Sequence, residues 1–211
     1  ATQNADVFVE VSGTLKACAA SLLKVSGDLR LLSSGPEAGL GELRLPPRQA
    51  GSSIMPRKVN PVIPEAVAQA AMAVFAHDQA IGFAAASGSL ELNPFLPLVA
   101  DSLLTSLDLL ARACRMLADF CVSGLAADEE RCRRHVNSST ATATALLPAL
   151  GYDGAKRLLD AAALSGRGLR ETAIAEGLLS GEEFDALTSP EAVCRLGSPD
   201  VGAGRHAKGD R

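Results

Sequence analysis

The residues best suited to chemistry lie in one short run, from Gly51 to Pro61. A Gly-Ser-Ser segment delivers two hydroxyls, and Lys58 and Asn60 follow just before the point where a helix is expected to begin. A lysine ammonium, an asparagine amide and the positive end of a helix dipole can converge on one carboxylate. The run therefore predicts a binding site for a small ligand that carries a carboxylate. The alternative is a polar linker between two helices.

The letters of this run, GSSIMPRKVNP, resemble the signature loop of the aspartase/fumarase superfamily, which reads G-S-S-x-M-P-x-K-x-N. Each specified position of that pattern holds the expected residue. The resemblance extends over residues 1 to about 196, as the central helices and the C-terminal domain of the superfamily. It implies an all-α fold, in which a bundle of long helices is followed by a small C-terminal helical domain.

Further segments favour one branch of the superfamily. Ala1–Asn4, Val59–Glu65 and Gly177–Ser180 resemble the aspartate ammonia-lyases, whereas Ala86–Asn93 resembles the class II fumarases. The majority implies the reversible anti elimination of ammonia from L-aspartate to give fumarate. The alternatives are a fumarate hydratase, which adds water instead of ammonia, and a catalytically silent helical fragment that only builds oligomers.

The resemblance also implies roles for individual residues. Ser52 would be the general base, and Lys58 and Asn60 would hold a carboxylate of the substrate. Because an alcohol is a weak base at neutral pH, the site would have to stabilise the Ser52 alkoxide electrostatically. Glu65 occupies the position of a family carboxylate that orients a histidine supplied from elsewhere. Gly51, Ser53 and Met55 are further loop positions of the signature.

The same resemblance implies that the site is incomplete. The superfamily builds each active site from three regions, normally contributed by three subunits of a tetramer, and only the third region is recognisable in this sequence. We therefore expect a C-terminal fragment that is inactive alone and forms a homotetramer through its long helices. The implied partner is a small dicarboxylate, aspartate or fumarate, and no cofactor or metal is implied. Arg57 departs from the family pattern, which has a small residue there.

The composition agrees with a helical fold and argues against other classes. Of the 211 residues, 47% are hydrophobic but only 3% are aromatic, so the core must be built from Ala, Leu and Val, which favours packed helices. A net charge of -4 without a basic stripe argues against nucleic-acid binding. No apolar run is long enough to span a membrane, so no membrane partner is expected.

The five cysteines are scattered and show no C-x-x-C spacing. This pattern predicts reduced thiols and a cytoplasmic protein. Three of them fall on apolar helical stripes and are expected to be buried, namely Cys18, Cys114 and Cys121.

Apolar periodicity near 3.6 predicts three long helices, over residues 3–33, 61–85 and 94–124. In the first of them the apolar stripe runs from Val7 through Val11 and Val25 to Leu32. Shorter helices are predicted over 128–136, 141–150, 153–165, 169–176 and 181–187, and no segment is predicted as a strand.

The change from long to short helices predicts the domain organisation. A long-helix segment is expected over residues 1–125, with the signature loop inside 35–60, and a small helical domain over 126–196. Residues 197–211 show no period and are expected to form a disordered tail.

Overall fold

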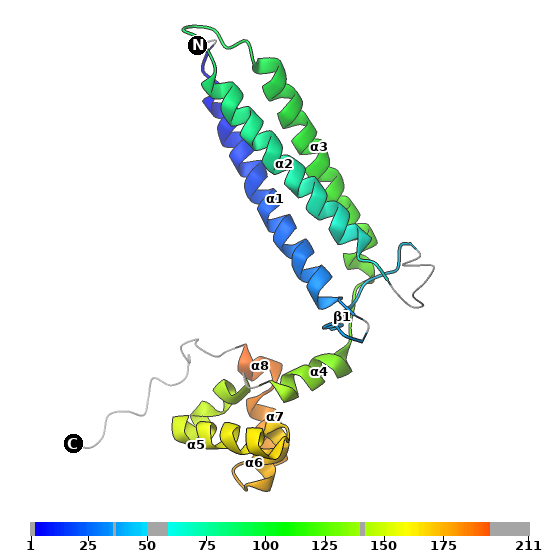
Figure 1. Ribbon diagram of the computed structural model, residues 1–211, viewed down its shortest axis with the longest axis vertical. Helices are drawn as coiled ribbons and strands as arrows, with labels where there is room; N and C mark the ends of the chain where they lie inside the picture. The colour runs from blue at the N-terminus through cyan, green and yellow to red at the C-terminus, as the bar shows by residue number, and fades with distance from the viewer. Residues whose placement is uncertain (1–2, 36, 50–58, 140–141, 195–211) are drawn as a thin grey trace, which may run out of the picture. The chain divides into compact units, whose positions relative to one another are not determined.

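The computed structural model describes residues 3–35, 37–49, 59–139 and 142–194. The chain divides into two compact units, Ala1–Glu129 and Glu130–Arg211. Both consist of helices, and the only strands in the described ranges are two residues long each (Figure 1). The all-α prediction is therefore confirmed. The predicted domain boundaries stay predictions, and residues 197–211 lie outside the described residues.

The first unit contains three long helices that run side by side (Figure 1). They are α1 (Asp6–Leu32), α2 (Val62–Ala86) and α3 (Leu96–Phe120), and α2 packs against both of the others. Pro61 directly precedes α2, because a proline is tolerated where the first helical N–H groups have no partner. The predicted third helix extended to residue 124, but residues Val122–Gly124 form a separate 3-10 turn, η1.

A short antiparallel pair joins distant parts of this unit. Strand β1 (Leu43–Arg44) pairs with β2 (Ala126–Ala127). Two residues are too few for the alternation that marks a strand in a sequence, so the pattern did not predict this pair.

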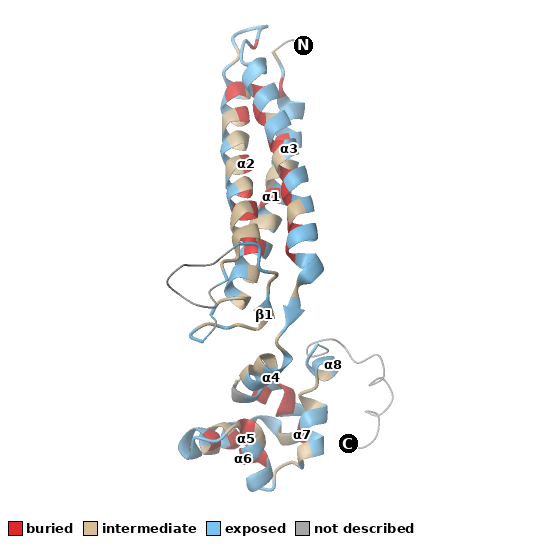
Figure 2. Ribbon diagram, turned by 90° about the vertical axis from the view of Figure 1, so that its right-hand side faces the viewer, coloured by how far each residue is buried: buried red, intermediate tan, exposed pale blue. Residues whose placement is uncertain are grey.

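Leucines of the predicted apolar stripe of α1 pack against the core, but the fully buried residues of this helix are small. The buried residues of α1 are Ser12, Ala19 and Ser26, whereas Val7 and Val25 are 58% and 44% exposed. Figure 2 shows the buried positions on the faces that the three helices turn toward one another. Small side chains let helix backbones approach closely. The side of α1 that is buried is therefore the side that carries these small residues, and the larger valines lie beside it.

The position of the buried side around each helix also explains why the predicted burial of two cysteines is wrong. Cys121 is buried as expected, but Cys18 and Cys114 are exposed. Each stands directly beside a buried alanine in the sequence, Ala19 or Ala113, and one step along a helix turns a side chain by about 100°. All five cysteines are free.

The second unit is built from shorter helices around its own core. They are α4 (Glu129–Ser138), α5 (Ala143–Ser165), α6 (Leu169–Ala175), α7 (Gly181–Leu187) and α8 (Pro190–Val193). Gly151 has a φ of 65° and interrupts α5, so the predicted helices 141–150 and 153–165 correspond to its two parts. The core contains Leu146, Leu158 and Phe184. Within the described ranges of both units, no helix is long and apolar enough to cross a membrane.

Candidate active site at the start of helix α2

The structure places two of the sequence-predicted site residues, Asn60 and Glu65, at the N-terminal end of α2. The Val62 N–H donates to the Asn60 carbonyl at 2.9 Å, and the Glu65 N–H donates to the Pro61 carbonyl at 3.1 Å. These bonds begin the helix, so both residues lie near the positive end of its dipole. Gly51, Ser52, Ser53, Met55 and Lys58 lie outside the described residues, and their roles stay predictions.

Glu65 faces the last turn of the neighbouring helix. The Arg30 Nε on α1 lies 3.8 Å from the Glu65 Oε1, and the Glu65 side chain remains 40% exposed. A cation at the end of one helix and an anion at the start of the next each complement a helix dipole. Because the pair is exposed and long, its net contribution is small, and the carboxylate stays accessible to a further partner. The sequence analysis singled out Glu65 but not Arg30, because a local pattern does not show which helices pack together.

The described chain on the two sides of residues 50–58 meets at one end of α3. A hollow of about 10 Å³ is lined by Pro46 and Arg48 from one side, by Asn60 and Pro61 from the other, and by Phe120 of α3. The two flanks of the predicted signature loop therefore lie against the same helix end.

Arg48 holds the first of these flanks. Its Nε donates to the Phe120 carbonyl at 2.8 Å, and its guanidinium carbon lies 5.2 Å from the centroid of the Phe120 ring. The sequence gave no signal for this contact, because the two residues are 72 positions apart.

The buried thiol in this hollow is not a candidate nucleophile. Burial raises the pKa of Cys121 above its ordinary value, although the nearby Arg48 cation opposes the shift. A raised pKa keeps the thiol protonated near neutral pH, and the thiolate is the reactive form.

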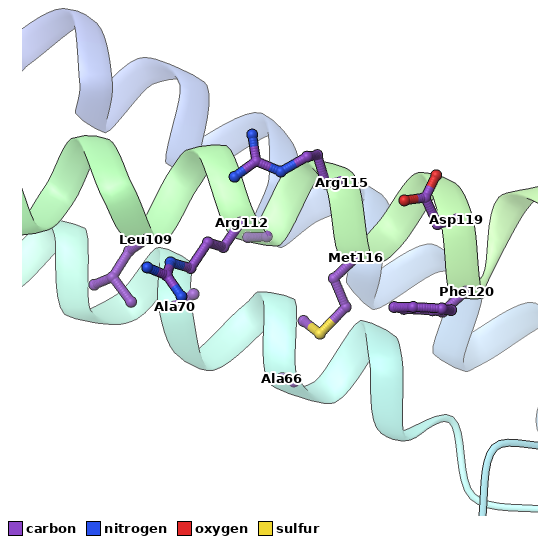
Figure 3. Close-up of a pocket in the computed structure, with 9 residues that line it drawn as sticks. Ala66, Ala70, Leu109, Arg112, Arg115, Met116, Asp119 and Phe120 are labelled. Atoms are coloured by element: carbon purple, nitrogen blue, oxygen red, sulfur yellow. The ribbon is translucent and has the colours of Figure 1, made fainter.

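A larger hollow, of about 480 Å³, lies between α2 and α3 (Figure 3). Ala66 and Ala70 leave space on α2, and Met116 and Phe120 project from α3 beside them, as Figure 3 shows. Arg112 at its rim is paired with Asp108 through Nε at 2.8 Å. In the part of the chain that the structure describes, no group of three or more His, Cys, Asp or Glu side chains could hold a metal ion.

A polar cluster lies farther along α2, away from the predicted site. The Ser12 hydroxyl donates to Asp78 Oδ1 and the Lys16 ammonium lies against Asp78 Oδ2, both at 2.7 Å. Burial alone would raise the pKa of Asp78, but these two hydrogen bonds and the charge of Lys16 hold it below its ordinary value. Asp78 follows Glu65 by 13 residues, about 20 Å along a helix, so this cluster joins α1 to α2 and does not extend the site.

The comparisons with known proteins match both ends of the described chain. Residues 1–76, which include the whole run from Gly51 to Pro61, match the family described as Lyase, and residues 143–195 match the family described as Fumarase C C-terminus. An aspartate ammonia-lyase from Pseudomonas fluorescens is 49% identical over 191 residues, which are 90% of this chain and 40% of that protein. The chain belongs to the aspartase/fumarase superfamily.

Other members of the superfamily agree with this membership. A class II fumarate hydratase from Pseudomonas putida is 46% identical over 190 residues, 90% of this chain and 41% of that protein. The crystal structure of a fumarate lyase:delta crystallin from Brucella melitensis superposes with a TM-score of 0.83 at 45% identity, over 93% of this chain and 42% of that one. The chain thus spans about 40% of the length of the curated relatives it matches. The relatives from the two branches are thus almost equally similar to this chain.

Proposed function

We propose that this chain is the C-terminal part of an aspartate ammonia-lyase, which eliminates ammonia reversibly from L-aspartate to give fumarate. The observation that carries the proposal is the signature run 51–61 within a chain that is 41–49% identical to four aspartate ammonia-lyases over about 90% of its length. Because the chain spans about 40% of those relatives, the proposed activity belongs to the enzyme that this part completes.

In the proposed reaction, Ser52 removes the proton from the carbon β to the amine. The electron pair of the broken C–H bond then delocalises into the adjacent carboxylate, which becomes doubly anionic. Lys58 and Asn60 hold this carboxylate, and their interactions strengthen as its negative charge grows. The C–N bond then breaks, and ammonia leaves with fumarate as the second product. Glu65 orients a histidine contributed from outside this chain.

We also propose a homotetramer of the completed enzyme, located in the cytoplasm. The exposed valines of α1, such as Val7 and Val25, support assembly because a second helix would cover them. The five free cysteines are in keeping with a reducing compartment.

A class II fumarase is the second candidate. It is favoured by the 46% identity to the Pseudomonas putida fumarate hydratase and by the segment Ala86–Asn93. Its reaction uses the same base and the same carboxylate contacts, and the group added or removed is water.

Two chimeras test the proposal against both alternatives. In the first, which we call the completed enzyme, this chain replaces the matched portion of the Pseudomonas fluorescens aspartate ammonia-lyase. In the second, it replaces the matched portion of the Pseudomonas putida fumarate hydratase. We expect the completed enzyme to release ammonia from aspartate. We express the activity of each chimera as a fraction of the activity of its parent enzyme. For the dehydration of malate by the second chimera, this fraction should be at least about tenfold smaller than for the release of ammonia by the completed enzyme. The reverse ranking would favour the fumarase, and two folded but inactive chimeras would favour the silent helical fragment.

A further inference from the structure

The chain reaches the signature run through a segment that we call the strap, residues 42–48. Main-chain contacts fix the strap to the segment that follows α3. Strand β1 pairs with β2, and the Asp128 N–H donates to the Glu42 carbonyl at 2.8 Å. Gly124 lies so close that an added Cβ would come within 2.6 Å of the Pro46 Cγ. The strap therefore packs directly against η1 and β2.

Arg48 ends the strap and supplies its side-chain contact with α3. The carbonyl of Phe120 belongs to the last turn of α3, where carbonyls lack a partner within the helix. The Arg48 Nε satisfies it at 2.8 Å, and the positive charge suits the negative end of the helix dipole. The same guanidinium lies over the aromatic ring at 5.2 Å, within the range of a cation–π interaction. One side chain thus makes two different contacts with one residue.

Asn60, on the other flank of the run, lines the same hollow as Arg48 and Phe120. The last turn of α3 is therefore a common support for Arg48, three positions before the signature run, and for Asn60, which is proposed to bind a carboxylate near the end of the run. We propose that Arg48 is a positioning residue, which fixes the strap to Phe120 and so holds the flanks of the run in register with each other. The effect of removing Arg48 on kcat rests on the proposed lyase function, whereas its effect on the structure around the strap does not.

A positioning role differs in its kinetics from direct binding of substrate. Misplacing catalytic groups by about 1 Å can cost on the order of a hundredfold in rate while the substrate still binds. We therefore expect Arg48→Ala to lower kcat about tenfold and to change KM by less than about threefold. If Arg48 instead bound a substrate carboxylate, its removal would mainly raise KM, and the increase would depend on salt.

The first experiment needs no substrate and uses the 211-residue chain. Arg48→Ala is compared with Arg44→Ala, a matched control in the same strap, whose exposed side chain makes no hydrogen bond or ion pair with described residues. We expect amide hydrogen exchange in peptides that contain Val62 and Gly124 to become at least about fivefold faster in Arg48→Ala only, with exchange in α1 unchanged. Equal exchange in the two variants would overturn the proposal.

The second experiment is a double-mutant cycle in the completed enzyme, with Arg48→Ala, Phe120→Leu and both together. If Arg48 acts through Phe120, the double variant should lose about as much kcat as Arg48→Ala alone. Because Phe120→Leu keeps the main-chain carbonyl, additive losses would refute an action of Arg48 through the Phe120 ring, and a loss confined to KM would refute the positioning role. A completed enzyme without activity, together with the exchange result above, would instead reject the lyase and leave the positioning role standing.

Discussion

At the scale of single residues, the proposed site combines one cation, one amide and one helix terminus around a carboxylate. Asn60 lies where α2 begins, next to the positive end of the helix dipole. Lys58 precedes it by two residues and would add a full charge. Such contacts serve catalysis when they strengthen as the carboxylate gains its second negative charge.

This arrangement predicts how the loss of Lys58 changes the kinetics of the completed enzyme. Lys58→Ala should raise KM and also lower kcat, because its charge meets the carboxylate before and during the reaction. A nitronate analogue of the intermediate should lose more affinity than aspartate does. Steady-state kinetics and inhibition constants measure both effects. A loss of less than about tenfold in kcat/KM, which is under about 1.4 kcal/mol, would indicate that the run is only a linker between two helices.

The partly buried carboxylate of Asp78 predicts a pH-dependent stability. Its pKa is lower in the folded chain than the ordinary value of 3.8, so its contribution is present above that pH and is lost as the pH falls through the folded pKa. Asp78→Asn should therefore lower the free energy of unfolding by about 2 kcal/mol at pH 7. The difference between the variant and the unaltered chain should shrink as the pH falls below 3.8. Urea unfolding at a series of pH values measures this.

The exposed pair between Lys24 and Asp28 provides the control for that measurement. Asp28→Asn should change the free energy of unfolding by less than about 0.5 kcal/mol. If Asp78→Asn had an equally small effect at pH 7, the cluster would not stabilise the contact between α1 and α2.

The letters of the run 51–61 predicted the superfamily, yet the contacts of the described site residues could not be predicted. Arg30 meets Glu65 across two helices, and Arg48 meets Phe120 across 72 positions. Both pairs depend on how the helices pack, which a local pattern does not encode. By contrast, Asn60 and Glu65 could be placed at a helix start, because Pro61 marks that start in the sequence.

At the scale of elements, periodicity predicts where a helix runs better than which face it buries. The first long helix was expected over 3–33 and spans Asp6–Leu32. Its contact line nevertheless follows Ser12, Ala19 and Ser26, which repeat every seven residues. A pattern of apolar residues predicts that the valines beside this line are buried. Close packing of helices instead buries the small residues on the line.

This contact line predicts opposite outcomes for two neighbouring alanines. Ala19 is fully buried between the helices, and Ala20 is exposed on the same turn of α1. Ala19→Leu should lower the free energy of unfolding by about 1–3 kcal/mol, because the added carbons do not fit into a packed contact. Ala20→Leu should change it by less than about 0.5 kcal/mol. Urea unfolding of both variants decides, and equal effects would contradict the assigned contact line.

At the scale of the whole molecule, the chain carries the proposed base but not every region of the proposed site. It spans about 40% of its curated relatives. We therefore expect the 211-residue chain alone to release no measurable ammonia from aspartate, because the substrate would lack its other anion contacts. A coupled ammonia assay on the purified chain measures this, and clear turnover would mean that other residues of the chain replace those contacts.

The most direct test of the account is ammonia release from aspartate by the completed enzyme with and without the Ser52 hydroxyl. We predict that Ser52→Ala lowers kcat by about a thousandfold or more and leaves the binding of aspartate nearly unchanged, since a general base acts only in the transition state. Ser53→Ala, which removes the neighbouring hydroxyl, should retain most of the activity. A loss of less than about tenfold in Ser52→Ala, or equal losses in the two variants, would contradict the assignment of Ser52 as the base.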